Sequence, residues 1–151
     1  MALEQEIQQA IFKSEGQKAM INIIYTYHWL TEHLKEILAT EDITLQQYNI
    51  LRILRGSDPK PLSTLTIRER MLDKMSDTSR IVDRLLLKGF VAKKMCSVDK
   101  RLVDINITED GKKMLLRIDA RENEMNAITN NLSEDESKLL SSLLDKLRNI
   151  Q

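Results

Sequence analysis

Apolar residues recur every three or four positions through much of this 151-residue chain, a spacing that places them on one face of a helix. The pattern predicts a long first helix over residues 4–39, a second helix that opens at Thr44, and a short third helix within 64–72. A long helix is predicted to begin after Thr108, and a final helix at Ser133. Thr44 and Ser133 each precede a Gln or Glu by three residues, which is the arrangement of a capping box. The chain is therefore expected to be mainly helical.

The middle of the chain departs from this pattern. A helix is predicted over residues 76–88, and Gly89 stands where a helix C-cap favours glycine. Two strands are predicted next, over 90–96 and 102–107, and the second alternates apolar and polar residues as a half-buried strand does. The tip between them, residues 97–101, is charged. A helix followed directly by a hairpin with a basic tip is the layout of a winged helix-turn-helix, so the predicted fold class is mainly α with a small β-hairpin wing (α+β).

The two ends of the chain are predicted to be long helices with wide apolar stripes. A small centre has too little surface to cover both stripes, so we expect the terminal helices to pack on a second copy in a two-fold homodimer. The alternative is a monomer in which the terminal helices pair with each other.

Composition supports a soluble globular protein, with 42% hydrophobic and 30% charged residues. No apolar run approaches the roughly 18 residues of a membrane-spanning helix, so no membrane partner is expected. The acidic, polar start, residues 1–6, lacks the features of a secretory signal, and the expected location is the cytoplasm. The single cysteine, Cys96, cannot form an internal disulfide, which agrees with a reducing compartment, and a redox role for it has no support.

Charge is distributed unevenly although the net charge is zero. From Lys60 to Arg101 there are eleven Lys or Arg against five Asp or Glu, a difference of +6, so the rest of the chain carries −6. A basic centre between acidic ends is typical of a protein that binds a polyanion. The alternative is an ordinary solvated surface with uneven charge.

The helix predicted over residues 76–88 has two distinct faces. Its apolar face, expected to pack inward, consists of Ile81, Val82, Leu85 and Leu86. Its polar face consists of Ser76, Asp77, Ser79, Arg80 and Arg84. Small polar residues let a helix end enter the major groove of DNA, where an arginine can pair with a guanine edge or a phosphate. Asp77 is better placed to stabilise the helix N-terminus than to contact a base. The alternative interpretation of Arg80 and Arg84 is that they belong to an ordinary solvated face of the helix.

The hairpin tip carries Asp99, Lys100 and Arg101. An arginine at such a tip is drawn to the negative potential of a DNA minor groove. Asp99 is close enough in sequence to hold the Arg101 guanidinium by a charge-assisted pair. Solubility and protection of the strand edge are the alternative explanation of a basic tip.

Residues 62–111 resemble the winged-helix core of MarR-type bacterial transcription regulators. The matching pieces, in order, are Ser79-Arg80-Ile81-Val82-Asp83-Arg84-Leu85, Gly89-Phe90-Val91, Asp99-Lys100-Arg101 and Ile107-Thr108-Glu109-Asp110-Gly111. Each piece is weak alone, and their order and spacing together are specific. The flanking helices extend the resemblance over nearly the whole chain in pattern rather than in motif.

The resemblance implies a homodimer that binds a pseudo-palindromic operator in double-stranded DNA, usually as a repressor, and that is often released by a small-molecule effector. It implies a single domain over 1–151, with dimerisation helices at 4–40 and 108–150 and a DNA-binding winged-helix lobe at 44–107. The implied DNA contacts are Ser76, Asp77, Thr78, Ser79, Arg80 and Arg84 on the recognition helix, and Arg101 with Asp99 and Lys100 on the wing. Residues 67–75 depart from the family because they lack its usual small residue and Gly, which makes Lys74 and Arg70 further candidates for phosphate contacts.

Aromatic and histidine residues gather in the first predicted helix. Tyr25, Tyr27, His28 and Trp29 are candidates for lining an effector pocket, although core or dimer-interface packing is the favoured interpretation. His28 and His33 are five positions apart, whereas two metal ligands on one helix face are three or four positions apart. Structural histidines are therefore favoured, and no metal site is predicted.

The sequence contains no Gly-rich phosphate loop and no nucleophile–base arrangement, so neither an enzyme nor a bound cofactor is expected. Two other functions stay open at this point. One is a winged-helix dimer that acts by protein–protein contact, as an anti-repressor does, and the other is a metal-responsive regulator that uses His28 or His33.

Overall fold

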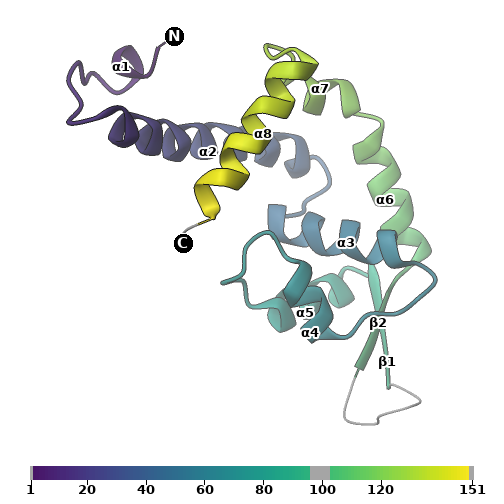
Figure 1. Ribbon diagram of the computed structural model, residues 1–151. Coiled ribbons are helices and arrows are strands. Elements are labelled where there is room, and N and C mark those ends of the chain that lie inside the picture. The colour runs from purple at the N-terminus through teal and green to yellow at the C-terminus, as the bar shows by residue number, and fades with distance from the viewer. Residues whose placement is uncertain (1, 96–102, 150–151) are drawn as a thin grey trace.

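The computed structural model describes residues 2–95 and 103–149 (Figure 1). Within them the chain is mostly helical, with one antiparallel pair of strands, and this confirms the predicted fold class. The helices are α1 (Leu3–Glu6), α2 (Glu15–Ala39), α3 (Leu45–Ser57), α4 (Thr64–Arg70), α5 (Thr78–Leu87), α6 (Glu109–Asp119), α7 (Glu122–Ala127) and α8 (Glu134–Arg148). The strands are β1 (Val91–Met95) and β2 (Val103–Ile107). None of these helices combines the length and the apolar character needed to cross a membrane.

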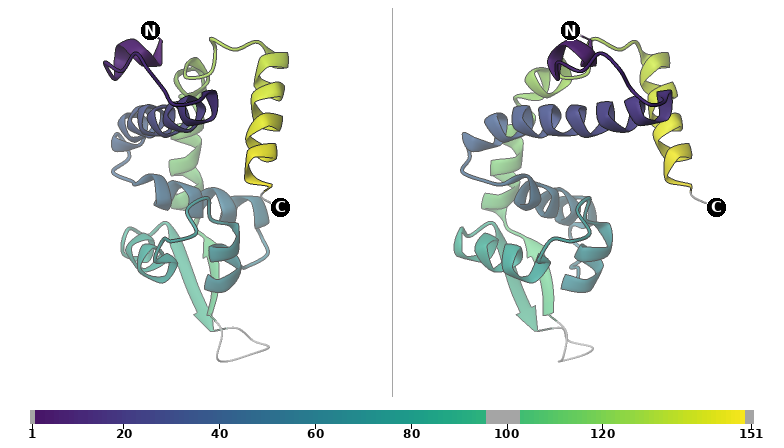
Figure 2. Two further views of the ribbon diagram at one scale, coloured as in Figure 1. Left: turned by 60° about the vertical axis from the view of Figure 1, so that its left-hand side comes forward. Right: turned by 90° about the vertical axis from the view of Figure 1, so that its left-hand side faces the viewer.

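A lower lobe is formed by α3, α4, α5 and the β1–β2 hairpin, and α2 lies above it (Figures 1 and 2). Helix α6 runs upward from the end of β2 to α7, and α8 descends from the segment that follows α7 (Figure 2). The hairpin extends away from the lobe at the opposite end from α2 (Figure 1). This arrangement places α5 and the hairpin on the side of the molecule that the terminal helices leave free.

One hydrophobic core holds the lobe together, and α6 takes part in it. Its fully buried side chains come from α2, α3, α4, α5, β2 and α6, and each contributes roughly 1.5–3 kcal/mol by leaving water. The largest are Leu38, Ile50, Leu51, Leu54, Ile67, Met71, Val82, Leu85, Ile105, Met114, Leu115 and Ile118. Because α5 and α6 share this core, the position of α5 is fixed relative to the helices above the lobe.

The hairpin pairs Val91 with Ile107 at its base and Met95 with Val103 at its outer end. Ile107 is buried at the base, whereas Val103 is 38% exposed where the strands leave the lobe. The segment before α4 adds a third strand position, because the N–H and carbonyl groups of Leu62 exchange hydrogen bonds of 3.0 and 2.9 Å with Ile105.

Helix boundaries agree with the sequence where a capping residue marks them. Both sides of the capping box form at Thr44 and at Ser133, and Thr108 caps α6 by accepting a hydrogen bond from the Gly111 N–H. Gly89 follows α5 with a φ of +75°, the left-handed conformation that glycine tolerates best. Gly56 does not end its helix, since α3 continues to Ser57.

The prediction of one helix over residues 4–39 is also wrong. The chain leaves helical geometry after α1, and α2 starts afresh at Glu15. Ser14 caps α2 by accepting a hydrogen bond of 3.1 Å from the Gln17 N–H, and the Gln17 side chain accepts one of 2.7 Å from the Lys13 N–H. The long helix expected after Thr108 is likewise divided, into α6 and α7.

Candidate nucleic-acid interface

Helix α5 presents a buried face and an exposed face, as its sequence predicts. Val82 and Leu85 are fully buried, and Ile81 packs partly buried against the same core. Leu86 is 40% exposed, so the expectation that it packs inward is wrong, because it lies at the edge of the apolar stripe. On the opposite face Ser79, Arg80 and Arg84 are exposed.

The N-terminus of α5 is capped by Asp77, whose carboxylate accepts a hydrogen bond of 3.1 Å from the Arg80 N–H. This confirms the structural role predicted for Asp77 and starts the helix at Thr78, two residues later than expected. Thr78 itself is only 4% exposed, so its side chain faces the core and not a ligand. The expectation that Thr78 contacts DNA is therefore wrong, because its side chain is buried while those of Ser79 and Arg80 are exposed.

The two arginines of α5 differ from two lysines close to them, which form ion pairs. Lys93 of β1 forms an ion pair with Asp83, and Lys88 at the C-cap of α5 forms one with Asp42. Within the described part of the chain, Arg80 and Arg84 take part in no ion pair, and both point into solvent. Their charges are therefore available to an external anion.

The turn between α4 and α5 is ordered without a glycine. Asp73 holds it by accepting hydrogen bonds from the Met75 N–H at 3.0 Å and from the Ser76 hydroxyl at 2.8 Å. Lys74 folds back and donates to the carbonyl of Glu69 at the end of α4. The ammonium of Lys74 is thus engaged within the turn, whereas Arg70 is exposed at the end of α4.

Four sequence candidates, Cys96, Asp99, Lys100 and Arg101, lie outside the described residues. The contacts expected of the last three therefore stay predictions. The strands that carry this tip are described up to Met95 and from Val103, and Lys94 is exposed on β1 close to it.

A groove of about 460 Å³ separates the N-terminal ends of α4 and α5. It is lined by Thr64, Leu65, Arg68, Met75, Ser76, Asp77, Thr78 and Ser79. Leu65 and Met75 are 63% and 93% exposed, although both are apolar. Sequence reasoning missed Leu65, Arg68 and Met75, and the only signal was that Met75 falls outside the apolar stripe of either neighbouring helix.

The aromatic candidates of α2 are divided between two clefts. Tyr25 and Trp29 line a cleft of about 270 Å³ with residues of α1, where the Tyr25 hydroxyl donates to Glu6 Oε2 at 3.1 Å. That hydrogen bond raises the pKa of Tyr25. Tyr27 lines another cleft, of about 330 Å³, between α2, the start of α3 and the α4–α5 turn. Only Tyr27 of the four thus belongs to a cleft that reaches the lobe, while His28 is exposed and stacks edge-on against Tyr27 with ring centroids 5.6 Å apart.

The histidines form no metal centre with other residues that the structure describes. His33 Nδ1 lies 2.8 Å from the Trp29 carbonyl oxygen, and its ring packs on Trp29 with centroids 4.5 Å apart. No group of three potential metal ligands gathers anywhere in residues 2–95 and 103–149.

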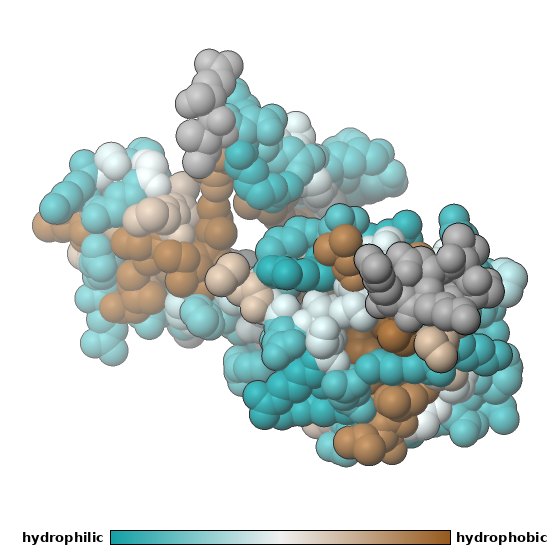
Figure 3. Space-filling view, turned by 90° about the horizontal axis from the view of Figure 1, so that it is seen from below, coloured by the Kyte–Doolittle hydropathy of each residue, from teal (hydrophilic) through white to brown (hydrophobic). Residues whose placement is uncertain are grey.

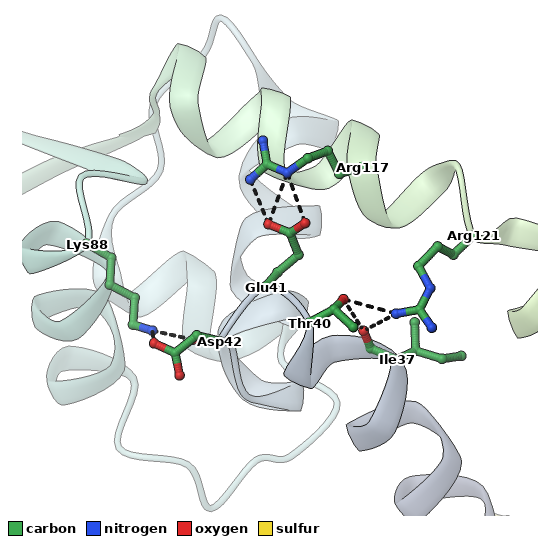
Figure 4. Close-up of polar contacts among 7 residues, drawn as sticks. All are labelled: Ile37, Thr40, Glu41, Asp42, Lys88, Arg117 and Arg121. Carbon is green, nitrogen blue, oxygen red and sulfur yellow. Dashed lines mark hydrogen bonds and ion pairs between the residues drawn. The ribbon is translucent and has the colours of Figure 1, made fainter.

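Polar contacts join the C-terminal end of α2 to the lobe (Figure 4). Asp42, in the α2–α3 turn, accepts a hydrogen bond of 2.8 Å from Lys88, which lowers the pKa of Asp42. Glu41 accepts hydrogen bonds of 2.6–3.1 Å from Arg117 of α6, which lower the pKa of Glu41. Beside them Arg121 donates to the Ile37 carbonyl at 2.8 Å. The ends of α5 and α6 are therefore both tied to the end of α2.

Helices α2 and α8 leave much of their apolar surface uncovered in the single chain. Leu143 is 54% exposed, and no residue of α8 is buried. The exposed apolar side chains on these two helices are Met20, Ile23, Ile24, Tyr25, Tyr27, Trp29, Leu139, Leu140, Leu143 and Leu147. An uncovered surface of this kind is typical of a contact with another polypeptide.

The order of elements, with a helix-turn-helix followed by a two-stranded wing, defines a winged helix-turn-helix protein. Residues 43–103 match the model of the MarR family. The chain is similar to a MarR-like transcription regulator from Bacillus cereus ATCC 10987, with 21% identity, a TM-score of 0.78, and coverage of 89% of this chain and 96% of that one. It is also similar to a MarR transcription factor from Planctomyces limnophilus, with 28% identity, a TM-score of 0.67, and coverage of 89% and 98%.

A third similar structure is a mutant MarR from E. coli in complex with operator DNA, with 23% identity, a TM-score of 0.78, and coverage of 98% of this chain and 99% of that one. Residues 43–103 thus match the model of a family whose members are transcription regulators and not enzymes, and nearly the whole chain shares the fold of the solved structures.

Proposed function

We propose that the protein is a repressor that binds a pseudo-palindromic operator as a homodimer. The observation that carries this proposal is the outer face of α5, where Arg80 and Arg84 are exposed beside Ser79 while Val82 and Leu85 anchor the helix in the core. A rigidly held helix with a small polar residue and an arginine near its N-terminus fits the major groove. Two such helices in a dimer would enter successive major grooves about 34 Å apart.

The residues of the proposed interface have different roles. Ser79 and Arg80, near the N-terminus of α5, are assigned to base edges, and Arg84, one turn further on, to a base edge or a phosphate. Arg101, supported by Asp99 and Lys100, is assigned to the minor groove. Lys74, Arg70 and Ser76 flank the recognition helix and are assigned to the DNA backbone, while Asp77 acts through its cap.

A homodimer is supported by the uncovered apolar surface of α2 and α8. In the proposed organisation, residues 4–40 and 108–150 supply the dimer contact and residues 44–107 the DNA-binding lobe. Burying the exposed leucines of α8 against a second copy removes them from water at roughly 25 cal/mol per Å².

Release by a small-molecule effector is supported by the cleft that Tyr27 lines. This cleft lies between α2 and the turn that precedes α5, so a ligand there contacts both the dimer helix and the lobe. In a structurally similar protein, BpsR of Bordetella bronchiseptica, 6-hydroxynicotinic acid regulates DNA binding; that chain is 16% identical with a TM-score of 0.75.

The test uses duplexes selected from a random library by the purified full-length protein. Arg80→Ala is expected to weaken binding to the selected duplex more than binding to random DNA, because a base contact distinguishes sequences and a phosphate contact does not. Lys113→Ala, an exposed cation on α6, is the matched control and should leave both affinities nearly unchanged. Failure to select any sequence would contradict the proposal and favour action by protein–protein contact.

A further inference from the structure

The groove between α4 and α5 contains an apolar pair that the fold does not use. Leu65, on the first turn of α4, is 63% exposed, and Met75, in the turn before α5, is 93% exposed. Both line the same groove of about 460 Å³. Single exposed apolar residues are common on protein surfaces. Two that line the same groove beside the proposed recognition helix indicate a binding surface for an apolar group.

We infer that Leu65 and Met75 contact thymine methyl groups in the major groove and thereby select thymines at the half-site positions that face the N-terminal end of α5. This inference rests on the proposed function and adds to it the chemistry of the bases that are read. The C5-methyl of thymine is the apolar group that the major-groove edge of a base pair presents, so an apolar protein surface there distinguishes thymine from the other bases.

The charges around the pair favour DNA over a protein as the occupant. Arg68 lines the same groove, and Arg80 is exposed on the neighbouring helix. The only acid in the lining is Asp77, whose carboxylate is occupied in capping α5. An apolar surface flanked by cations is complementary to a thymine methyl group in a groove flanked by phosphates. Figure 3, seen from below, shows hydrophobic patches set within a largely hydrophilic surface on this lobe.

The backbone under both side chains is held in place. The Met75 N–H donates to Asp73 Oδ1 at 3.0 Å, and Ser63 caps α4 by accepting a hydrogen bond of 3.1 Å from the Thr66 N–H. The backbone position of Leu65 is therefore fixed. The unbranched Met75 side chain can adjust its rotamer to a base step without movement of the turn.

Replacement of thymine by deoxyuracil removes the methyl group alone, so the experiment is a uracil scan of the duplex selected by the wild-type protein. At the thymines that Leu65 and Met75 contact, the loss of one methyl group should weaken binding by about fourfold, the effect of burying one such group. In Leu65→Ala and Met75→Ala, the penalty should disappear at the thymine that the deleted side chain contacted and persist elsewhere. Leu116→Ala is the matched control, since Leu116 is also 63% exposed but lies on α6.

The outcomes separate the inference from the proposed function. Specific binding with no uracil penalty at any position overturns the inference and leaves the proposed function intact. A penalty that both variants retain in full also overturns it, because other residues then read the methyl groups. Failure to bind any sequence specifically overturns the proposed function and the inference with it. Both side chains are exposed, so the variants are expected to fold, and unchanged thermal unfolding verifies this.

Discussion

Gly111 lies so close to Phe90 that a Cβ atom at residue 111 would be 2.4 Å from the Phe90 carbonyl oxygen. The same carbonyl accepts a hydrogen bond of 3.0 Å from the Thr108 N–H, and the Thr108 hydroxyl donates to the Gly89 carbonyl at 2.7 Å. The first turn of α6 is thus pressed against the residues that end α5 and begin β1. This contact sets α5 at a fixed position relative to α6, and it explains why glycine occupies residue 111.

Gly111→Ala should destabilise the protein by about 2 kcal/mol or more, because the added methyl meets backbone atoms that cannot move aside as a flexible side chain can. Urea unfolding at a fixed protein concentration measures this. Gly56→Ala is the matched control: nothing lies within 4 Å of a Cβ there, and the residue is inside α3, so alanine should stabilise the protein by about 0.5–1 kcal/mol. Equal effects of the two changes would show that the close approach at Gly111 is not the cause.

Thr78→Val should stabilise the protein by about 1 kcal/mol. The Thr78 hydroxyl is buried, and Oγ1 has no hydrogen-bond partner among the described residues, so its removal at nearly constant shape relieves an unpaired polar group. Operator affinity should be unchanged in this variant and reduced in Ser79→Ala, whose hydroxyl is on the exposed face. A large loss of affinity in Thr78→Val would instead return Thr78 to the set of DNA contacts.

Leu143→Arg should convert the dimer to monomer, because it places a charge in the apolar surface of α8 that a second copy is proposed to cover. Sedimentation velocity gives the oligomeric state, and operator affinity should fall in parallel as the two recognition helices lose their link. Leu87→Arg makes the same change at an exposed leucine of α5, outside the proposed dimer contact, and should leave the dimer intact. A wild-type protein that sediments as a monomer at every concentration tested would contradict the dimer directly.

Glu41 should make stability depend on pH. Hydrogen bonds from Arg117 lower the pKa of Glu41 in the folded state, so the folded protein binds this proton less readily than the unfolded chain does. The resulting stabilisation is fully present above the ordinary glutamate pKa of about 4.3 and is lost as the pH falls through the lowered pKa. Glu41→Gln should therefore be less stable than wild type near neutral pH, with the difference shrinking in acid.

Urea unfolding of both proteins between about pH 7 and about pH 3 tests this dependence. Glu122→Gln, at an exposed position of α7, is the control and should follow the wild-type curve. A gap between Glu41→Gln and wild type that stays constant over the whole range would show that the ion pair with Arg117 is not its source.

The sequence predicted those features of the fold that local chemistry determines. Thr44 and Ser133 each carry a complete capping box, and Gly89 supplies the left-handed residue after α5, so these boundaries could be read directly. The break before α2 has a similar signal, Ser14 with Gln17 three residues on, but an amphipathic pattern that runs across residues 4–39 concealed it.

The exposed positions of the candidate site could be predicted within one helix, whereas features that depend on the arrangement of separate elements could not. The exposed positions of Ser79, Arg80 and Arg84 follow from the helical period alone, whereas the burial of Thr78 depends on where α5 begins. Successive residues of a helix point about 100° apart, so Tyr25 and Tyr27 diverge to separate clefts although they are close in sequence.

Contacts between distant segments left no trace in the sequence pattern. Lys88 and Asp42 are 46 residues apart, and nothing in their local sequence indicates that one binds the other. Leu65 and Met75 likewise line one groove, although their local sequence does not indicate that they share it.

A salt series tests most directly whether this protein binds a specific DNA operator. Binding of the purified protein to DNA from its own promoter region is compared with binding to random DNA of equal length. We expect tighter binding to the promoter DNA, and a log–log salt slope of about −0.9 for each phosphate contact. Equal, weak binding to both DNAs over the whole series, repeated with duplexes from a random library, would contradict it.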